Sequence, residues 1–223
     1  MHLRHEWKHE INRCDLLVLR QRLRAVMKRD SHAVEGTYFI RSLYFDNAAD
    51  KTLREKLDGV NNREKFRIRY YNHDPSLIHL EKKSKRNGLG SKEIAELTAA
   101  EAQSIVEGQL AWMKEDSRAL IRELYAKMQS QGLRPKTIVD YTREPFVYAP
   151  GNVRVTLDYD IRTGLGCTDF LNPDCVTVPV AHSPILLEVK WDEFLPELIR
   201  DIIQLDGRHA SAFSKYAICR IYD

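Results

Sequence analysis

The stretch Lys65–Tyr70, which reads KFRIRY, alternates cationic side chains with apolar and aromatic ones. Successive side chains of a β-strand point to opposite faces. Lys65, Arg67 and Arg69 therefore share one face, and the apolar and aromatic residues share the other. The pattern predicts a strand that buries one face in a core and turns a strongly basic face the other way.

The same arrangement recurs along the chain, with charged or polar side chains on one face, in Leu80–Lys83, Tyr141–Arg143, Val153–Asp158 and Leu187–Trp191. A half-buried sheet whose charged face meets water is the commonest explanation of such alternation. The alternative is a closed antiparallel barrel whose charged face surrounds a polar lumen and whose apolar outer face is covered by helices. Repetition over several strands favours the barrel, but periodicity alone does not separate the two architectures.

Strand-like and helix-like segments together indicate an α+β fold. The connections between strands are mostly of hairpin length, which favours antiparallel pairing. We expect a closed antiparallel β-barrel with helices packed outside, formed by residues 1–223 as a single domain. The expected strands cover 4–10, 38–45, 65–71, 77–83, 136–141, 145–148, 153–160, 176–180 and 185–191, and the expected helices cover 15–27, 49–57, 98–106, 116–128, 196–203 and 211–221.

The composition excludes several classes of protein. The 223 residues include 35 Lys and Arg against 32 Asp and Glu, a net charge of +3 that is too small to indicate a nonspecific nucleic-acid binder. The sequence contains neither the apolar run of a signal peptide nor the roughly 18 consecutive apolar residues of a membrane span. The four cysteines lack metal-site spacing, so we expect free thiols and a cytoplasmic protein.

The charged strand faces indicate the chemistry of the lumen. A confined set of Lys and Arg side chains repels itself unless a polyanion neutralises it, and Arg and Lys both bind phosphate oxygens. Carboxylates such as Glu188 would repel that anion unless a divalent cation bridged them, and Mg²⁺ or Mn²⁺ suits such oxygen ligands. The residues therefore favour phosphoryl transfer on a triphosphate or polyphosphate. We expect a basic interior, with Glu188 as its principal carboxylate, inside a partly acidic exterior.

The chain resembles the VTC domain, the polyphosphate polymerase domain of the vacuolar transporter chaperone complex, in a bacterial stand-alone form. That family belongs to the triphosphate tunnel metalloenzymes, which are related to the CYTH group. The resemblance covers essentially the whole chain, from Arg4 to Tyr222. It rests on ordered motifs at 4–9, 42–46, 66–70, 80–83, 141–146, 153–158, 187–190 and 214–216.

The resemblance implies a polymerase that binds ATP and Mn²⁺ or Mg²⁺ inside a tunnel and adds the γ-phosphate to a growing polyphosphate chain. The other implied partner is pyrophosphate or polyphosphate. We expect no nucleic-acid partner, and the sequence shows no membrane segment. Glu188 is implied as the metal ligand, and Arg67, Arg69, Arg143 and Lys215 as the catalytic residues. The implied phosphate- and substrate-binding residues are Lys8, Arg67, Arg69, Lys83, Lys92, Tyr141, Arg143, Arg154, Lys190, Ser214 and Lys215.

One motif departs from the wider superfamily, which begins with Glu-x-Glu-x-Lys. Here Arg4–Lys8 retains only Glu6 and Lys8, which fits the polymerase branch better than the triphosphatases. A metal-dependent inorganic triphosphatase or nucleoside triphosphatase and a non-catalytic polyphosphate-binding module remain alternatives. The roles of Glu6, Glu81 and Asp158 in metal binding stay open, although pairing with a cation is favoured for Glu81.

Overall fold

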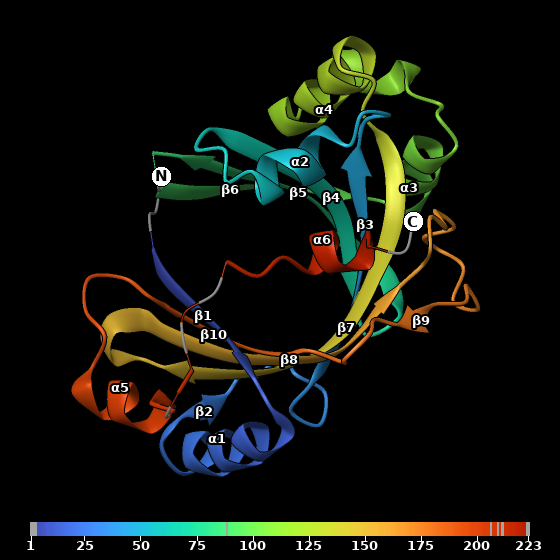
Figure 1. Ribbon diagram of the computed structural model, residues 1–223. Coiled ribbons are helices and arrows are strands. Elements are labelled where there is room, and N and C mark those ends of the chain that lie inside the picture. Colours follow the sequence, from blue (N-terminus) through green and yellow to red (C-terminus); the bar gives the residue numbers. More distant parts are fainter. Residues whose placement is uncertain (1–3, 88, 206, 209, 211, 222–223) are drawn as a thin grey trace.

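A computed structural model describes residues 4–221 apart from 88, 206, 209 and 211. Its strands form one strongly curled sheet in which all neighbouring strands are antiparallel (Figure 1). The order across the sheet is β1 (His5–Ile11), β10 (Ile185–Trp191), β8 (Val153–Thr163), β7 (Arg134–Tyr148), β3 (Tyr38–Asp46), β4 (Arg63–Tyr71), β5 (Asp74–Arg86) and β6 (Leu89–Leu97). Two short strands, β2 (Lys28–Arg29) and β9 (Val178–Pro179), pair with β7 and β8.

The curled sheet is open. Its end strands β1 and β6 do not pair with each other in the described part of the chain, so the fold is a half-barrel rather than the closed barrel that we expected. An isolated bridge between His9 and Ala210 occupies part of the free edge of β1. The edge strand β6 carries exposed Lys92, Glu93 and Glu96, and charged residues of this kind oppose edge-to-edge pairing.

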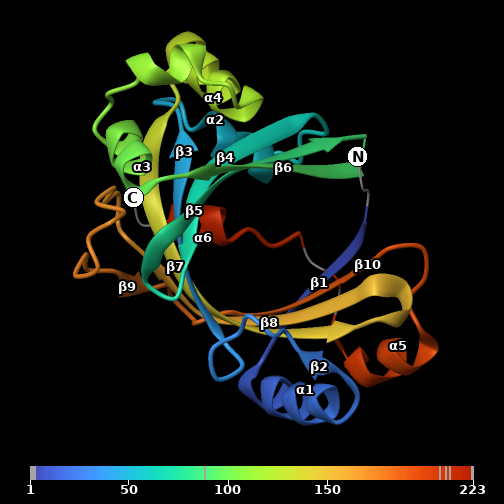
Figure 2. The ribbon, with the colours of Figure 1, turned by 180° about the vertical axis from the view of Figure 1, so that it is seen from behind.

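Helices cover the apolar outer face, as predicted. The helices α1 (Arg13–Val26) and α5 (Glu197–Ile203) pack beneath β7, β8 and β10 in a core that includes Leu23, Val155 and Ile199 (Figure 2). The helices α3 (Ala99–Val106) and α4 (Ala119–Ser130), with the 3₁₀ turn η1 (Ala111–Glu115), cover β3 to β6 in a second core. The side chains at both contacts are fully or almost fully buried, and each contributes about 1.5–3 kcal/mol through loss of its apolar contact with water.

Two capping boxes define where outer helices begin. Asn12 caps α1 together with Asp15, and Thr98 caps α3 together with Glu101. In each case, the cap side chain accepts from a backbone N–H that lacks a partner within the helix, and the acidic side chain accepts from the cap backbone. The capping box at Thr98 confirms the start that the sequence predicted for α3.

A short helix, α6 (Lys215–Cys219), lies inside the curl of the sheet and is visible at the centre of Figure 1. The Tyr216 hydroxyl donates to Asp46 at the end of β3 (2.7 Å), and Thr163 at the end of β8 donates to the Cys219 carbonyl (3.0 Å). A third buried apolar cluster, which includes Tyr44 and Tyr216, fills this part of the concave face. The helix α2 (Lys51–Leu57) packs beside α6 and β4.

The structure also differs from the expected elements in detail. Strand β6 was not predicted because its sequence has few of the β-branched and aromatic residues that are typical of strands and contains Gly90, Lys92 and Glu93 instead. The helix expected over 211–221 is shortened to α6. No helix among the described residues is long and apolar enough to cross a membrane. The four cysteines are free thiols, with Cys167 and Cys175 in contact at 3.1 Å between their sulfur atoms.

Candidate functional site

Cationic side chains from strands at both ends of the sheet face the same concave space. Lys65 on β4 is close enough to Lys8 on β1 and Lys215 on α6 to be influenced by their charges. Lys83 on β5 is influenced in the same way by Arg67 on β4 and Lys190 on β10. The curl of the half-barrel therefore brings together charges that lie far apart in the strand order.

This crowding changes the proton affinity of two lysines. Burial, together with Arg67, Lys8 and Lys215, lowers the pKa of Lys65 to about 8 against the opposing effect of Tyr44. Burial and the nearby cations also hold the pKa of Lys83 well below its ordinary value. Among the described residues, no carboxylate lies within ion-pair distance of either ammonium group. Both lysines are therefore placed to gain from an added anion.

The arginines of the concave face are held by carboxylates. The Arg67 guanidinium donates to Glu81 through Nε (2.8 Å) and through a terminal nitrogen (2.5 Å), and Glu81 is fully buried. Arg143 forms a bidentate pair with Asp158, with both distances at 2.7 Å, and Lys215 donates to the same carboxylate at 2.6 Å.

These pairs keep the carboxylates ionised and fix the guanidinium planes. Burial raises the pKa of Asp158, but Arg143 and Lys215 outweigh that effect and lower it to about 2. Burial likewise opposes ionisation of Glu81, but Arg67, Arg69 and Lys92 hold its pKa well below the usual range. Both side chains therefore carry a negative charge at neutral pH.

Two tyrosines, one on β3 and one on β7, contact the arginines of β4. Arg67 donates to the Tyr44 hydroxyl (2.8 Å), and Arg69 donates to the Tyr141 hydroxyl (3.0 Å). The Lys215 ammonium lies 4.5 Å from the centre of the Tyr141 ring, which is a cation–π contact. Burial would raise the pKa of Tyr44, but Arg67, Lys65 and Arg69 lower it to about 7.

Glu188 lies in a second carboxylate–lysine cluster, between β1 and β10. Lys8 lies 3.1 Å from Glu6 and 3.6 Å from Glu188, while Lys190 lies 3.5 Å from Glu6 and also contacts Glu188. Burial raises the pKa of Glu188, but Lys190, Lys8 and Arg143 hold it well below its ordinary value. Glu6 and Glu188 thus share the same two lysines at this end of the concave face.

These two carboxylates fit a divalent cation by their chemistry. Mg²⁺ is usually held by one or two carboxylates and completes its octahedral shell with substrate phosphates and water. The described residues contain no group of three or more His, Cys, Asp or Glu side chains that could hold a metal without such help. Glu188 and Glu6 would therefore hold the cation together with an anionic substrate.

A family model of the VTC domain matches residues 3–221 of this sequence. The chain belongs to the VTC domain family. A search of curated proteins finds no match.

Solved structures were also compared with this VTC domain. A proposed adenylate cyclase from Bacillus halodurans has a TM-score of 0.52 and 13% identity, over 85% of this chain and 80% of that chain. A proposed adenylate cyclase from Vibrio parahaemolyticus has a TM-score of 0.45 and 8% identity, over 90% of this chain and 83% of that chain. The Bacillus likeness is evidence for a shared fold only, and the Vibrio likeness adds nothing to it.

The structure gathers most of the side chains that the sequence indicated for this VTC domain. Lys92, on the edge strand, pairs with Glu81 at 2.6 Å. Two predicted residues have other contacts. Arg154 lies opposite Lys190 on the same face, but its guanidinium lies 3.2 Å from Asp30. The Ser214 hydroxyl caps α6 by accepting from the Ala217 N–H. The side chains brought together on the concave face are Lys8, Arg67, Arg69, Lys83, Lys92, Tyr141, Arg143, Glu188, Lys190 and Lys215.

Sequence reasoning did not assign a site role to Lys65, Tyr44 or Glu6. Lys65 was placed on the basic face by alternation, and that signal alone could have added it to the site. Tyr44 follows the same alternation on β3, but its contact with Arg67 depends on the pairing of β3 with β4. The expectation that Glu188 is the principal interior carboxylate also needs correction, because Glu6, Glu81 and Asp158 pair with the same set of cations.

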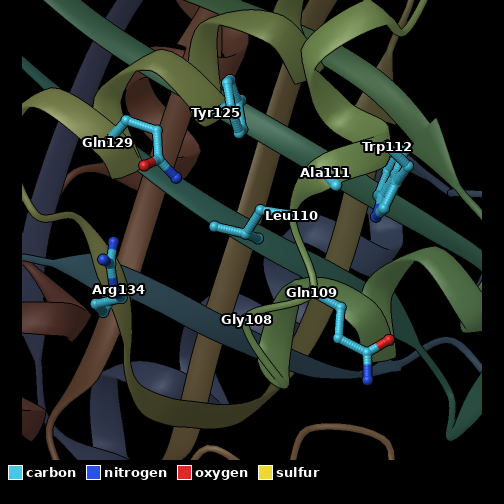
Figure 3. Close-up of a pocket in the computed structure, with 8 residues that line it drawn as sticks. All are labelled: Gly108, Gln109, Leu110, Ala111, Trp112, Tyr125, Gln129 and Arg134. Atoms are coloured by element: carbon cyan, nitrogen blue, oxygen red, sulfur yellow. The ribbon is translucent and has the colours of Figure 1, made fainter.

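A surface hollow lies elsewhere, outside the sheet (Figure 3). It is formed by the segment between α3 and α4, by α4 itself and by the start of β7. The Arg134 guanidinium there donates to the backbone carbonyls of Met128 and Leu133, both at 2.7 Å. Arg134 is the one charged residue among those that line the hollow, and a single positive charge is not enough to bind a polyanion. The lining residues are Gly108, Gln109, Leu110, Ala111, Trp112, Tyr125, Gln129 and Arg134.

Proposed function

We propose that this VTC domain is an ATP-dependent polyphosphate polymerase that works with Mn²⁺ or Mg²⁺. The observation that carries the proposal is a charge imbalance among the described residues of the concave face, where nine cations share only four carboxylates, Glu6, Glu81, Asp158 and Glu188. A polyanion supplies the missing negative charge. The nine cations are Lys8, Lys65, Arg67, Arg69, Lys83, Lys92, Arg143, Lys190 and Lys215.

The reaction needs positioning and charge stabilisation more than covalent chemistry from the protein. A terminal oxygen of the acceptor phosphate attacks the γ-phosphorus of ATP, and the bond from that phosphorus to the β–γ bridging oxygen breaks. ADP leaves with the bond electrons, and the acceptor is longer by one phosphate. Arg67, Arg69, Arg143 and Lys215 would stabilise the charge that spreads over the transferring group.

The carboxylate partners explain how the arginines keep their geometry before substrate arrives. Glu81 holds Arg67, and Asp158 holds Arg143 and Lys215, so each cation is oriented in advance. Lys83, Lys190 and Lys8 would bind further phosphate oxygens. A divalent cation held by Glu188, with Glu6 beside it, would neutralise charge on the phosphate oxygens. We also propose that the half-barrel and its helices form one domain.

Product analysis tests the proposal. The purified protein with ATP and Mn²⁺ should form polyphosphate that is visible on a gel, together with an equivalent amount of ADP. Arg67→Ala and Lys215→Ala should each abolish chain growth, whereas Arg24→Ala on the exposed outer helix α1 should leave it unchanged. Release of phosphate without chain growth would identify a triphosphatase instead. Polyphosphate binding without turnover would identify a binding module.

A further inference from the structure

The cross-strand pairs of β4 and β5 change in charge along the concave face. Arg67 lies opposite Glu81, which is a compensated pair. The next pair on the same face is Lys65 opposite Lys83, and the following pair is Arg63 opposite Lys85. Like charges directly opposite each other on neighbouring strands destabilise a sheet. Two successive like-charge pairs are therefore a cost to the fold that calls for a function.

The uncompensated pairs extend beyond the proposed site, toward the rim of the half-barrel. Arg63 is the first residue of β4, and Lys85 is the residue before the last of β5. Arg63 and Arg67 are four positions apart, which is about 13 Å along a strand and longer than a triphosphate group. In the described part of the chain, no carboxylate lies within ion-pair distance of Arg63, Lys65, Lys83 or Lys85.

Side chains from other elements add to this cationic rim. Lys56, on α2, donates to the Ala212 carbonyl. Burial lowers its pKa, and the nearby charges of Arg63, Lys8 and Lys85 lower it further. Arg63, Lys8 and Lys85 lie on β4, β1 and β5, so cations from both halves of the curled sheet meet near Lys56. Lys92 on β6 lies directly opposite Lys83 and continues the cationic row across the sheet.

We infer that Arg63 and Lys85, with Lys56 beside them, form an outer track that binds the part of a long polyphosphate chain lying beyond the transferring phosphates. The track rests on the proposed function, because it extends the same site toward a longer ligand. It selects for chain length: a triphosphate would be held by the inner cations, whereas a long chain would also cover the two uncompensated pairs.

The test is binding of tripolyphosphate and of long-chain polyphosphate, measured by isothermal titration calorimetry with EDTA present to prevent turnover. The double variant Arg63→Gln/Lys85→Gln should weaken long-chain binding about tenfold while changing tripolyphosphate binding less than about twofold. The matched control Arg24→Gln/Lys28→Gln removes the same two charges from exposed positions on α1 and β2. It should leave both affinities unchanged.

A conservative variant separates loss of charge from loss of structure. Arg63→Lys/Lys85→Arg keeps both charges and should retain long-chain affinity. Equal weakening of both ligands in the Gln variant, or no weakening of either, would overturn the outer track. The polymer assay is read separately: length-selective binding by a protein that makes no polyphosphate would refute the proposed polymerase and leave the track standing.

Discussion

The two faces of strand β4 differ in what they contribute. On the outer face, Phe66, Ile68 and Tyr70 are at most 2% exposed and pack beneath α3 and α4. On the inner face, Lys65 lies near Arg67, Lys8 and Lys215 and over the Tyr44 ring, and Arg67 is held by Glu81. The outer face therefore stabilises the half-barrel, whereas the inner face places charges where the fold alone would not favour them. Substitutions on the two faces should therefore change stability for different physical reasons: charge compensation on the inner face and loss of packed volume on the outer face.

The largest effect is expected where the inner face depends on one carboxylate. Glu81→Gln keeps the shape of the side chain but leaves buried Arg67 and Arg69 without their compensating charge. Loss of one partner from a buried ion pair costs about 3–5 kcal/mol in the free energy of unfolding. Urea unfolding monitored by circular dichroism measures this loss of unfolding free energy. Added polyphosphate should restore part of this stability.

A matched control distinguishes the buried pair from charge loss in general. Glu93 is exposed on the adjacent strand β6, and its carboxylate lies 3.2 Å from the Lys82 ammonium. Lys82 also pairs with Glu123. Glu93→Gln should change the free energy of unfolding by less than about 1 kcal/mol. Equal effects of the two substitutions would show that Glu81 has no special compensating role.

The outer face should respond to loss of volume. Ile68→Ala removes a fully buried side chain of the core beneath α4 and should cost about 2–5 kcal/mol in the free energy of unfolding. Ile94→Ala, at a position on β6 that is 52% exposed, is the control and should have little effect. If both variants unfold alike, the outer face of β4 is not the stabilising face.

Alternation along β4 was sufficient to predict both of its faces from the sequence, because a strand has a period of two whatever it pairs with. The same reasoning placed Lys83, Arg143 and Lys190 correctly on the concave face. It could not decide whether the sheet closes, since that depends on how the edges of β1 and β6 are used. It also could not find the contact of Tyr44 with Arg67, which arises from strand register. Alternation also placed Arg154 on this face, where it lies opposite Lys190, but its pairing with Asp30 involves a loop that the strand pattern does not describe.

A smaller effect is expected from Lys65→Met, which removes an uncompensated cation from the inner face. Its pKa of about 8 lies below the ordinary value of 10.5, so the unfolded chain holds this proton more strongly than the folded one. Stability therefore rises with pH between these two values, and the cost of Lys65 is present in full below pH 8. The variant should gain about 1–2 kcal/mol at pH 7, and this gain should vanish above pH 10.5.

Polyphosphate binding and the pH profile are the measurements that separate this prediction from simple hydrophobic stabilisation. Lys65→Met should bind polyphosphate more weakly than the wild type while unfolding at higher urea concentration at pH 7. Glu64→Met, at the neighbouring half-buried position that faces Lys82 and Lys127, is the control and should show neither loss of binding nor a gain that disappears at high pH. A gain in Lys65→Met that is independent of pH would contradict the electrostatic cost of the inner face.

The smallest effect is expected at Tyr44, which joins the inner face of β3 to Arg67 and to α6. Tyr44→Phe removes the hydroxyl that accepts from Arg67 but keeps the ring, which stacks on Tyr216 at 5.0 Å between ring centres. Loss of one such hydrogen bond should lower the free energy of unfolding by about 1 kcal/mol. Because Arg67 would lose one of the two groups that orient it, chain growth from ATP should slow more than the small loss of stability explains. Tyr125→Phe, on the outer helix α4, is the control: equal slowing in both variants would mean that Tyr44 supports only the fold, and that the inner face does not depend on its hydroxyl.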